Sequence, residues 1–415
     1  MSIDWGLVAE WAIKSAISCF VLATGFAYMT YAERKVAALF QTRIGPNRAG
    51  PFGFLQPAAD GIKLLFKEEL IPAGADKFIF LLAPIITVIP ALIILAVVPW
   101  GPIVDIPCCV ITIPGLGTTL GQQIFIIHGL GITDSNVAVL YILSVASIAV
   151  YGIVLAGWSS DNKYAMLGGI RSSAQMISYE LALGLSLVGP LMLAGSMSIK
   201  DIVDAQAKVW YIVLQPVAAV VFYIAALAEV NRAPFDMPEA EQELTAGYHT
   251  EYSGMKFSLF FMAEYIKMIG VSAIFVSLFL GGWRGPLADS VPLLGLVYFF
   301  GKIVLSLFFM IWLRSTHPRL RYDRLMAFGW KVMLPIALAN VLVTAAALID
   351  RTLFLIVVGV VIVIVAGVLV AQYWRAAQRL RARQAGRMAT ASAAATASAA
   401  PSSAAAAPAG VPEPR

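Results

Sequence analysis

The feature that most constrains the fold of this chain is a series of apolar stretches of about 20 residues, each long enough to cross a membrane as a helix. Apolar residues make up 60% of the 415 residues and charged residues only 13%. Short segments of alternating polarity, which are typical of membrane β-barrels, are not seen. The sequence therefore predicts an all-α integral membrane protein.

We expect a polytopic membrane domain over residues 1–374, with about nine transmembrane helices. The predicted spans lie near 7–31, 77–99, 136–158, 164–192, 209–230, 256–281, 292–314, 331–350 and 352–373. Residues 375–415 are first rich in arginine and then in Ala, Ser and Pro. This tail lacks the apolar residues needed to pack, so we expect it to be disordered.

The positions of the basic residues predict the orientation of the chain. If the N-terminus is outside, most of the 29 Lys and Arg residues fall in the inside loops 32–76, 159–163, 231–255 and 315–330 or in the tail. Basic residues accumulate on the cytoplasmic side of membrane proteins. We therefore expect an outside N-terminus and a cytoplasmic tail. In an outside loop, Ser198 to Asp201 is typical of a capping box that opens a short helix.

The densest acidic segment follows the fifth predicted span and contains Asp236, Glu239, Glu241 and Glu243. Ionisable groups at the edge of a membrane are costly and commonly functional, because lipid offers no water to solvate them. Proton handling is the chemistry that this segment indicates. Ordinary solvated loop charge is the alternative interpretation, and the segment by itself leaves it open.

Three further carboxylates lie within or at the ends of predicted spans: Glu180, Glu229 and Glu264. A carboxyl group in a low-dielectric site can load and unload a proton near neutral pH, as a proton relay requires. Structural roles remain open for all three. Glu264 could pair with Lys267 and Glu229 with Arg232, because each pair is three residues apart, and Glu180 could be hydrogen-bonded to a neighbouring helix.

The first inside loop combines a turn-rich basic stretch with an amphipathic helix. Gly, Pro and Asn between Arg43 and Arg48 predict a shaped loop. From Leu55 onward, apolar residues recur at spacings of three and four, and Asp60 and Lys63 lie on the opposite face. This helix is too short to span the bilayer, so we expect it in the membrane interface on the cytoplasmic side. A simple anchoring role is the alternative.

The chain offers few ligands for a redox centre. Its three cysteines include the adjacent pair Cys108 and Cys109, and its three histidines fall in three separate regions. An iron–sulfur cluster generally needs four ligands, and metal sites need suitably spaced ones. We therefore expect this chain to bind no iron–sulfur cluster, flavin or metal.

Three long stretches resemble the H subunits of bacterial complex I, the proton-pumping NADH:quinone oxidoreductase, a family that includes the mitochondrially encoded equivalent. They are 32–35, 43–68 and 231–254, and with the order of the spans the resemblance covers roughly residues 5–350. It implies a multi-pass component of the bacterial inner (plasma) membrane within an enzyme complex. The implied partners are the peripheral-arm subunits that carry the terminal iron–sulfur cluster and the quinone headgroup site, the small and antiporter-like membrane subunits, and the lipid bilayer, with no nucleic acid.

The resemblance also implies a long chamber for quinone, which is the substrate, either ubiquinone or menaquinone. We expect the apolar tail of quinone to enter between the first span and the interfacial helix. The residues implied near the quinone path are Arg34, Arg43, Arg48, Asp60, Lys63, Phe66 and Arg232. Those implied on the proton path are Glu180, Glu229, Asp236, Glu239, Glu241, Glu243, Glu251 and Glu264.

Three other functions remain possible from the residues alone. The anchoring subunit of a membrane-bound hydrogenase would share the bundle without handling quinone, but the loop from Gly45 to Arg48 favours the quinone-linked form. A stand-alone ion transporter often shows internal repeats, and the sequence has no clear repeat. A purely structural anchor would have no need of Glu180.

Overall fold

The computed structural model describes residues 5–101, 105–110, 124–128, 131–236, 245–286, 288 and 292–350, together with the single residues 352, 356 and 378. The chain divides into two units, Met1–Leu348 and Ile349–Arg415. Apart from these single residues, the predicted ninth span and the tail lie outside the described residues, as do the loop acids Glu239, Glu241 and Glu243.

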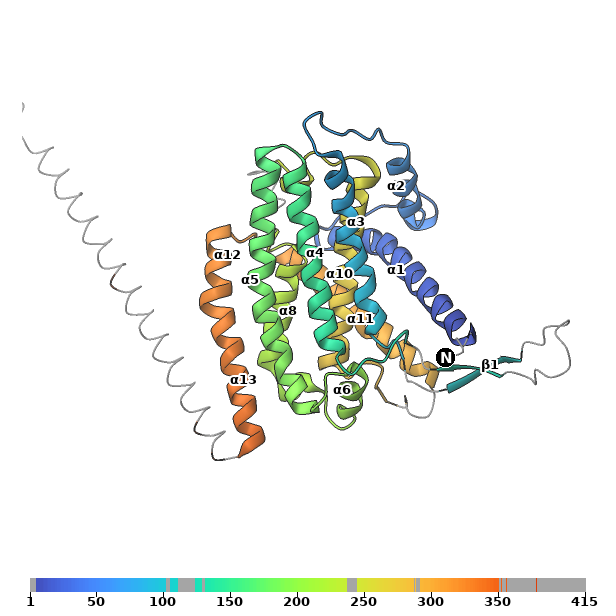
Figure 1. Cartoon of the computed structure of the whole chain (residues 1–415), viewed down its shortest axis with the longest axis vertical. Coiled ribbons are helices and arrows are strands. Elements are labelled where there is room, and N and C mark those ends of the chain that lie inside the picture. Colours follow the sequence, from blue (N-terminus) through green and yellow to red (C-terminus); the bar gives the residue numbers. More distant parts are fainter. Residues whose placement is uncertain are drawn as a thin grey trace, which may run out of the picture. The chain divides into compact units, whose positions relative to one another are not determined.

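The first unit is a bundle of helices (Figure 1). Its longer helices are α1 (Trp5–Phe40), α3 (Lys77–Ile94), α4 (Ala138–Ser159), α5 (Lys163–Ala194), α8 (Pro216–Glu229), α10 (Gly254–Phe279), α11 (Pro292–Thr316) and α13 (Leu334–Ile349). The shorter ones are α2 (Gln56–Leu65), α6 (Ile199–Ala205), α7 (Tyr211–Leu214) and α12 (Tyr322–Phe328). The remaining turns are η1 (Pro51–Gly53), η2 (Leu95–Val97), η3 (Gly247–His249) and the π-helical segment η4 (Gly329–Met333).

Seven helices in the described part of the chain are long and apolar enough to cross a membrane. The predicted count of about nine is therefore not confirmed. The segment predicted near 209–230 is divided at Gln215 into α7 and α8, and α8 has only 14 residues. An antiparallel ribbon of β1 (Asp105–Val110) and β2 (Ile124–His128), which the sequence pattern does not predict, lies between α3 and α4 in the chain.

The end of α1 corrects one predicted boundary. The first span was expected to end near residue 31, but α1 continues without interruption to Phe40. The added residues are mostly Ala, Glu, Arg, Lys and Leu, which favour helix although they lower the hydropathy. Glu33, Arg34 and Lys35 therefore stand on a helix and not in a loop. Glu33 is only 8% exposed.

Helices α4 and α5 approach closely where glycines replace larger side chains. A Cβ atom added at Gly157 in α4 would lie 2.7 Å from the Ala165 carbonyl oxygen and 3.3 Å from the Gly169 Cα atom, both in α5. Small residues at such positions let the backbones of membrane helices pack against each other. This contact fixes α5, which carries Glu180, against its neighbour.

We predict that Gly157→Ala destabilises the bundle by about 1–3 kcal/mol, because the new methyl group meets backbone atoms and overpacks the contact. Thermal unfolding of the purified chain or complex would measure the loss. Gly301→Ala in α11 is the matched control, because nothing lies within 4 Å of a Cβ atom at that position. Equal unfolding temperatures for the two variants would contradict the prediction.

Candidate functional site

Five ionisable side chains from four parts of the fold meet in what we call the charged cluster. Its members are Glu33 of α1, Arg232 of the segment after α8, Glu264 and Tyr265 of α10, and Arg314 of α11. The Arg232 Nε atom lies 2.9 Å from Glu264 Oε1, and an Arg232 Nη atom lies 3.8 Å from Glu33 Oε1. The Tyr265 hydroxyl donates to Glu33 Oε2 at 2.6 Å, and Arg314 also pairs with Glu33.

The charged cluster is largely removed from solvent. Arg232 is 7% exposed, and Glu33 and Glu264 are each 8% exposed. The Arg232 guanidinium also stacks over the Tyr265 ring, 4.2 Å from the ring centroid. A buried ion pair is costly to desolvate and strongly destabilising to break. The pairing therefore holds Arg232 in one place between two carboxylates.

The backbone that carries Arg232 is attached to α5 by side-chain amides. The Gln175 Nε2 atom donates to the carbonyl oxygens of Ala228 and Phe235, at 2.9 and 2.8 Å. The Asn231 Nδ2 atom donates to the Ser172 hydroxyl at 2.8 Å. These bonds lie on both sides of Arg232 in the sequence, so they fix the turn that presents its guanidinium.

Two polar cavities lie near the charged cluster, and the side chains of the cluster line only the first of them. One, of about 490 Å³, is lined by charged side chains of the cluster and by Arg34 and Arg43. The second, of about 760 Å³, is also lined by Arg34 and Arg43 and extends along the loop to Arg48. Arg34 reaches α2, where its guanidinium lies 2.8 Å from Asp60 Oδ2.

The structure thus brings together five of the seven residues expected near the quinone path: Arg34, Arg43, Arg48, Asp60 and Arg232. The other two, Lys63 and Phe66, are exposed on or just after α2 and line neither polar cavity. Phe66 is 87% exposed.

An apolar cavity of about 380 Å³ adjoins the smaller polar one, because Ile311 lines both. It lies between α1, α10 and α11 and is lined by side chains such as Met29, Ile269 and Phe300. The sequence predicts an apolar channel between the first span and the interfacial helix, and that channel stays a prediction. This apolar cavity is formed by α1 with α10 and α11, a contact that the sequence pattern does not reveal.

A second group of charges, the carboxylate–lysine group, lies on α5, α8 and α10 and consists of Glu180, Glu229 and Lys267. Lys267 interacts electrostatically with both carboxylates and also with Glu264. Glu229 likewise interacts with Glu180, which accepts a hydrogen bond from the Ser147 hydroxyl. The three carboxylates predicted in separate spans therefore interact with one lysine, and Glu264 links this group to the charged cluster.

The structure shows which partners Arg232 and Glu264 have, a question that the sequence left open. Arg232 pairs with Glu264 and Glu33, whereas a pairing with Glu229 was considered from the spacing of three residues. Helix α8 ends at Glu229, so the helical spacing does not extend to Arg232. For Glu264, the contact with Arg232 at 2.9 Å accompanies its interaction with Lys267.

Two other predicted acids have partners outside these groups. Asp236 is 7% exposed and lies 3.0 Å from an Nη atom of Arg319. Glu251 accepts a hydrogen bond of 2.7 Å from Asn162, the residue that caps the N-terminus of α5. Nearby, burial raises the pKa of Tyr252 to about 12, so its hydroxyl stays protonated and donates to the Phe80 carbonyl.

Sequence reasoning missed three members of the charged cluster: Glu33, Tyr265 and Arg314. Glu33 was assigned to a loop because the first span was drawn too short. Arg314 lies at the end of a predicted span, where basic residues are common. Tyr265 is adjacent to Glu264, and its position in an apolar segment beside a carboxylate was a usable signal. Among the described residues, no group of three or more His, Cys, Asp or Glu side chains is arranged to hold a metal ion.

Comparison with known proteins relates this geometry to a family. Residues 13–345 match the family described as NADH dehydrogenase. The chain belongs to this family. It is 53% identical to the first of two NADH-quinone oxidoreductase H subunits of Geobacter sulfurreducens over 328 residues, which are 78% of this chain and 90% of the relative.

Two further members of the family show the same extent of similarity. The NADH-quinone oxidoreductase H subunit of Thermomicrobium roseum is 49% identical over 348 residues, covering 81% of this chain and 96% of the relative. That of Protochlamydia amoebophila is 49% identical over 322 residues, covering 78% of this chain and 92% of the relative. The family match covers every described member of the charged cluster and of the carboxylate–lysine group.

Proposed function

We propose that this chain is the membrane subunit of a respiratory NADH:quinone oxidoreductase, in which it forms the quinone-access chamber and couples quinone reduction to proton translocation. Membership of the NADH dehydrogenase family supports the assignment to the complex. The observation that carries the coupling is the position of Glu264. It pairs with Arg232 at the wall of the polar cavity and interacts with Lys267 in the carboxylate–lysine group.

The adjoining cavities suit an amphiphilic substrate. A long isoprenoid tail needs an apolar passage, which the cavity between α1, α10 and α11 offers. A quinone headgroup needs a few polar contacts, and the cationic side chains of Arg34, Arg43 and Arg232 line the polar cavity next to it. Ligand sites commonly combine apolar walls with a small number of placed polar groups.

The coupling follows from the shared carboxylate. Reduction of a quinone to a quinol consumes two electrons and two protons, so each group at the polar cavity that supplies a proton becomes more negative by one charge. This change of charge alters the electrostatic interaction between Arg232 and Glu264. Glu264 also interacts with Lys267, so the effect extends to the lysine. Because Lys267 also interacts with Glu229 and Glu180, a change of charge at Glu264 acts on all of these groups. Protons would then leave toward antiporter-like partner subunits.

The test of this proposal is to neutralise the two carboxylates of the carboxylate–lysine group separately, as Glu180→Gln and Glu229→Gln, in membranes that carry the assembled complex. Each change removes a proton-binding group and keeps the shape of the side chain. We expect proton translocation to fall sharply, to a fraction on the order of one-hundredth to one-tenth of the parent, because proton transfer by a placed group is worth at least this factor. NADH-driven quinone reduction and proton uptake are recorded together, after a native gel confirms assembly.

Asp204→Asn is the matched control. It neutralises a carboxylate of α6 that is partly exposed, pairs with Arg284 and belongs to neither group of charges. We expect this variant to translocate protons normally. Normal translocation by an assembled Glu180→Gln or Glu229→Gln complex would exclude that residue from the relay.

A further inference from the structure

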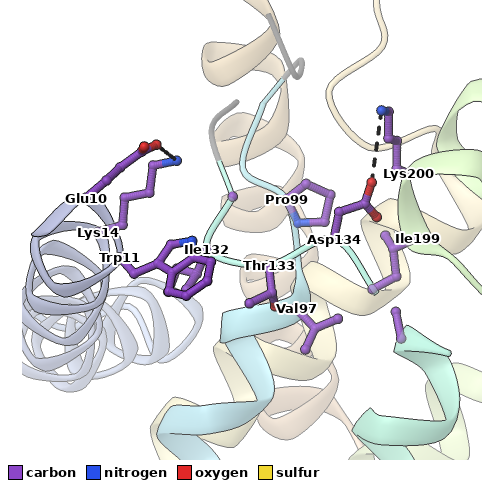
Figure 2. Close-up of a pocket in the computed structure, with 12 residues that line it drawn as sticks. Glu10, Trp11, Lys14, Val97, Pro99, Ile132, Thr133, Asp134, Ile199 and Lys200 are labelled. Atoms are coloured by element: carbon purple, nitrogen blue, oxygen red, sulfur yellow. Dashed lines mark ion pairs between the residues drawn. The ribbon is translucent and has the colours of Figure 1, made fainter. Parts of the chain in front are cut away.

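A separate cavity lies at the end of α1 opposite to the charged cluster, and the proposed reaction does not use it. Its volume is about 390 Å³. As Figure 2 shows, α1 forms one wall, and the chain near Val97 and Pro99, the segment 131–134 and the start of α6 form the other.

Each wall of this cavity carries one ion pair. On α1, Lys14 Nζ lies 2.6 Å from Glu10 Oε1. On the opposite wall, Lys200 Nζ lies 4.0 Å from Asp134 Oδ2, and Asp134 Oδ1 accepts a hydrogen bond from the Ser198 hydroxyl at 3.2 Å. Both pairs are drawn in Figure 2. The sequence predicted that Ser198 caps α6, but its hydroxyl is engaged by Asp134 instead.

The rest of the lining is apolar and includes Trp11, Val97, Ile132 and Ile199. The tryptophan lies near the start of the first membrane-capable helix, and Trp is enriched where membrane proteins meet the lipid headgroups. A cavity at this level with apolar walls and paired charges is open to a molecule that is itself part of the membrane surface.

The charges select the chemistry of that molecule. Two carboxylates and two ammonium groups sum to zero, so a headgroup of one sign would meet as much repulsion as attraction. A zwitterion with a phosphate for the lysines and an ammonium for the carboxylates matches both. The ammonium must also be able to donate hydrogen bonds, since charge-assisted hydrogen bonds to carboxylates are the strong ones. A primary ammonium does so and a quaternary one does not.

We propose that this cavity binds the phosphoethanolamine headgroup of a membrane phospholipid. The phosphate is held between Lys14 and Lys200, and the primary ammonium lies between Glu10 and Asp134. The Lys200–Asp134 pair is long and partly exposed, with side-chain exposures of 38% and 51%, so exchanging it for contacts with the lipid costs little.

Photo-crosslinking in the assembled complex tests the proposal. Phosphatidylethanolamine, phosphatidylcholine and phosphatidylglycerol, each carrying the same diazirine on an acyl chain, are incorporated into membranes, and labelled peptides are mapped by mass spectrometry. We expect labelling of the peptides around 10–14 and 131–134 by phosphatidylethanolamine to exceed that by phosphatidylcholine about tenfold, the factor expected from one charge-assisted hydrogen bond.

Two double variants separate the halves of the site. Glu10→Gln with Asp134→Asn removes the ammonium contacts, so the preference for ethanolamine over choline should disappear and labelling by phosphatidylglycerol should rise. Lys14→Met with Lys200→Met removes the phosphate contacts and should lower labelling by all three lipids. Lys208→Met, on an exposed lysine outside the cavity, is the matched control for lost charge. Assembly of each variant is checked on a native gel, and quinone reduction should be unchanged.

Four results would overturn the proposal. Equal labelling by the three lipids in the parent complex would mean that the cavity contacts the surrounding bilayer lipid without selecting a headgroup. Labelling unaffected by either double variant would place the lipid elsewhere. Displacement of the lipid by inorganic phosphate would identify a site for free anions. Absence of labelling in the assembled complex would mean that another protein of the complex fills the cavity. None of these results bears on the proposed quinone and proton functions.

Discussion

Arg232→Met is expected to lower NADH-driven quinone reduction by the assembled complex about 100-fold. Two effects combine. The change removes a cation from the wall of the polar cavity, and it leaves Glu33 and Glu264 buried without the guanidinium between them. Misplacement of a binding group by about 1 Å can alone cost a factor of 10². The quinone reductase rate per assembled complex, compared with the amount of complex on a native gel, measures the effect.

The same change should also weaken the fold. Removing one partner of a buried ion pair costs about 3–5 kcal/mol, because the other charge remains without compensation. Arg232→Lys separates charge from shape, since lysine keeps the charge but cannot make the forked contact with both carboxylates. We expect it to assemble and to be intermediate in rate. Arg284→Met removes a guanidinium that pairs with Asp204 elsewhere and should leave the rate unchanged. A parental rate in assembled Arg232→Met would contradict the proposed chamber.

The second large effect is expected from Lys267→Met. This lysine is the only member of the carboxylate–lysine group with a positive charge, and it interacts with three carboxylates. Methionine fills a similar volume, but the carboxylates lose the charge that offsets their ionised forms. We expect proton translocation per electron pair to fall about tenfold or more, a loss in the range attributed to a placed proton-transfer group, while quinone reduction falls less. Recording proton translocation and quinone reduction at the same time gives the number of protons translocated per electron pair, and a fall in this number supports the prediction.

Lys302→Met is the control for the loss of a half-buried, hydrogen-bonded lysine. The Lys302 Nζ atom donates to the carbonyl oxygens of Leu280, Gly282 and Arg284, at 2.6, 3.0 and 2.7 Å. It therefore supports the C-terminal end of α10 and contacts no carboxylate in these bonds. Its removal should lower the unfolding temperature and leave the ratio of protons to electrons unchanged. An unchanged ratio in Lys267→Met would mean that the lysine only balances charge.

Several parts of this structure could be predicted from the sequence. Carboxylates are rare in apolar segments, so Glu180, Glu229 and Glu264 were identifiable one by one. Their meeting around Lys267 could not be predicted, because it depends on which faces of α5, α8 and α10 pack together. Spacing within one segment was a poor guide to pairing, as Arg232 shows, because the helix ends before it.

The other gaps have physical causes as well. Hydropathy marks the end of a membrane-spanning stretch but not the end of a helix, so Glu33 was assigned to a loop although its helix continues for seven residues. The break between α7 and α8 is at Gln215. Pro216 follows at the first position of α8, where a proline is well accommodated. The proline in this apolar segment therefore indicates a helix start that hydropathy alone does not reveal.

The hydrogen bonds of Gln175 and Asn231 have a consequence for how the chamber can move. They attach the turn that carries Arg232 to α5, which also carries Glu180. We therefore expect Arg232 and Glu180 to move together as parts of one rigid unit. Glu33 stands on α1, which is the least enclosed of the seven membrane-capable helices that the structure describes. A movement of α1 away from the bundle would therefore break the contacts of Glu33 with Arg232, Tyr265 and Arg314, whereas the Arg232–Glu264 pair would stay in place.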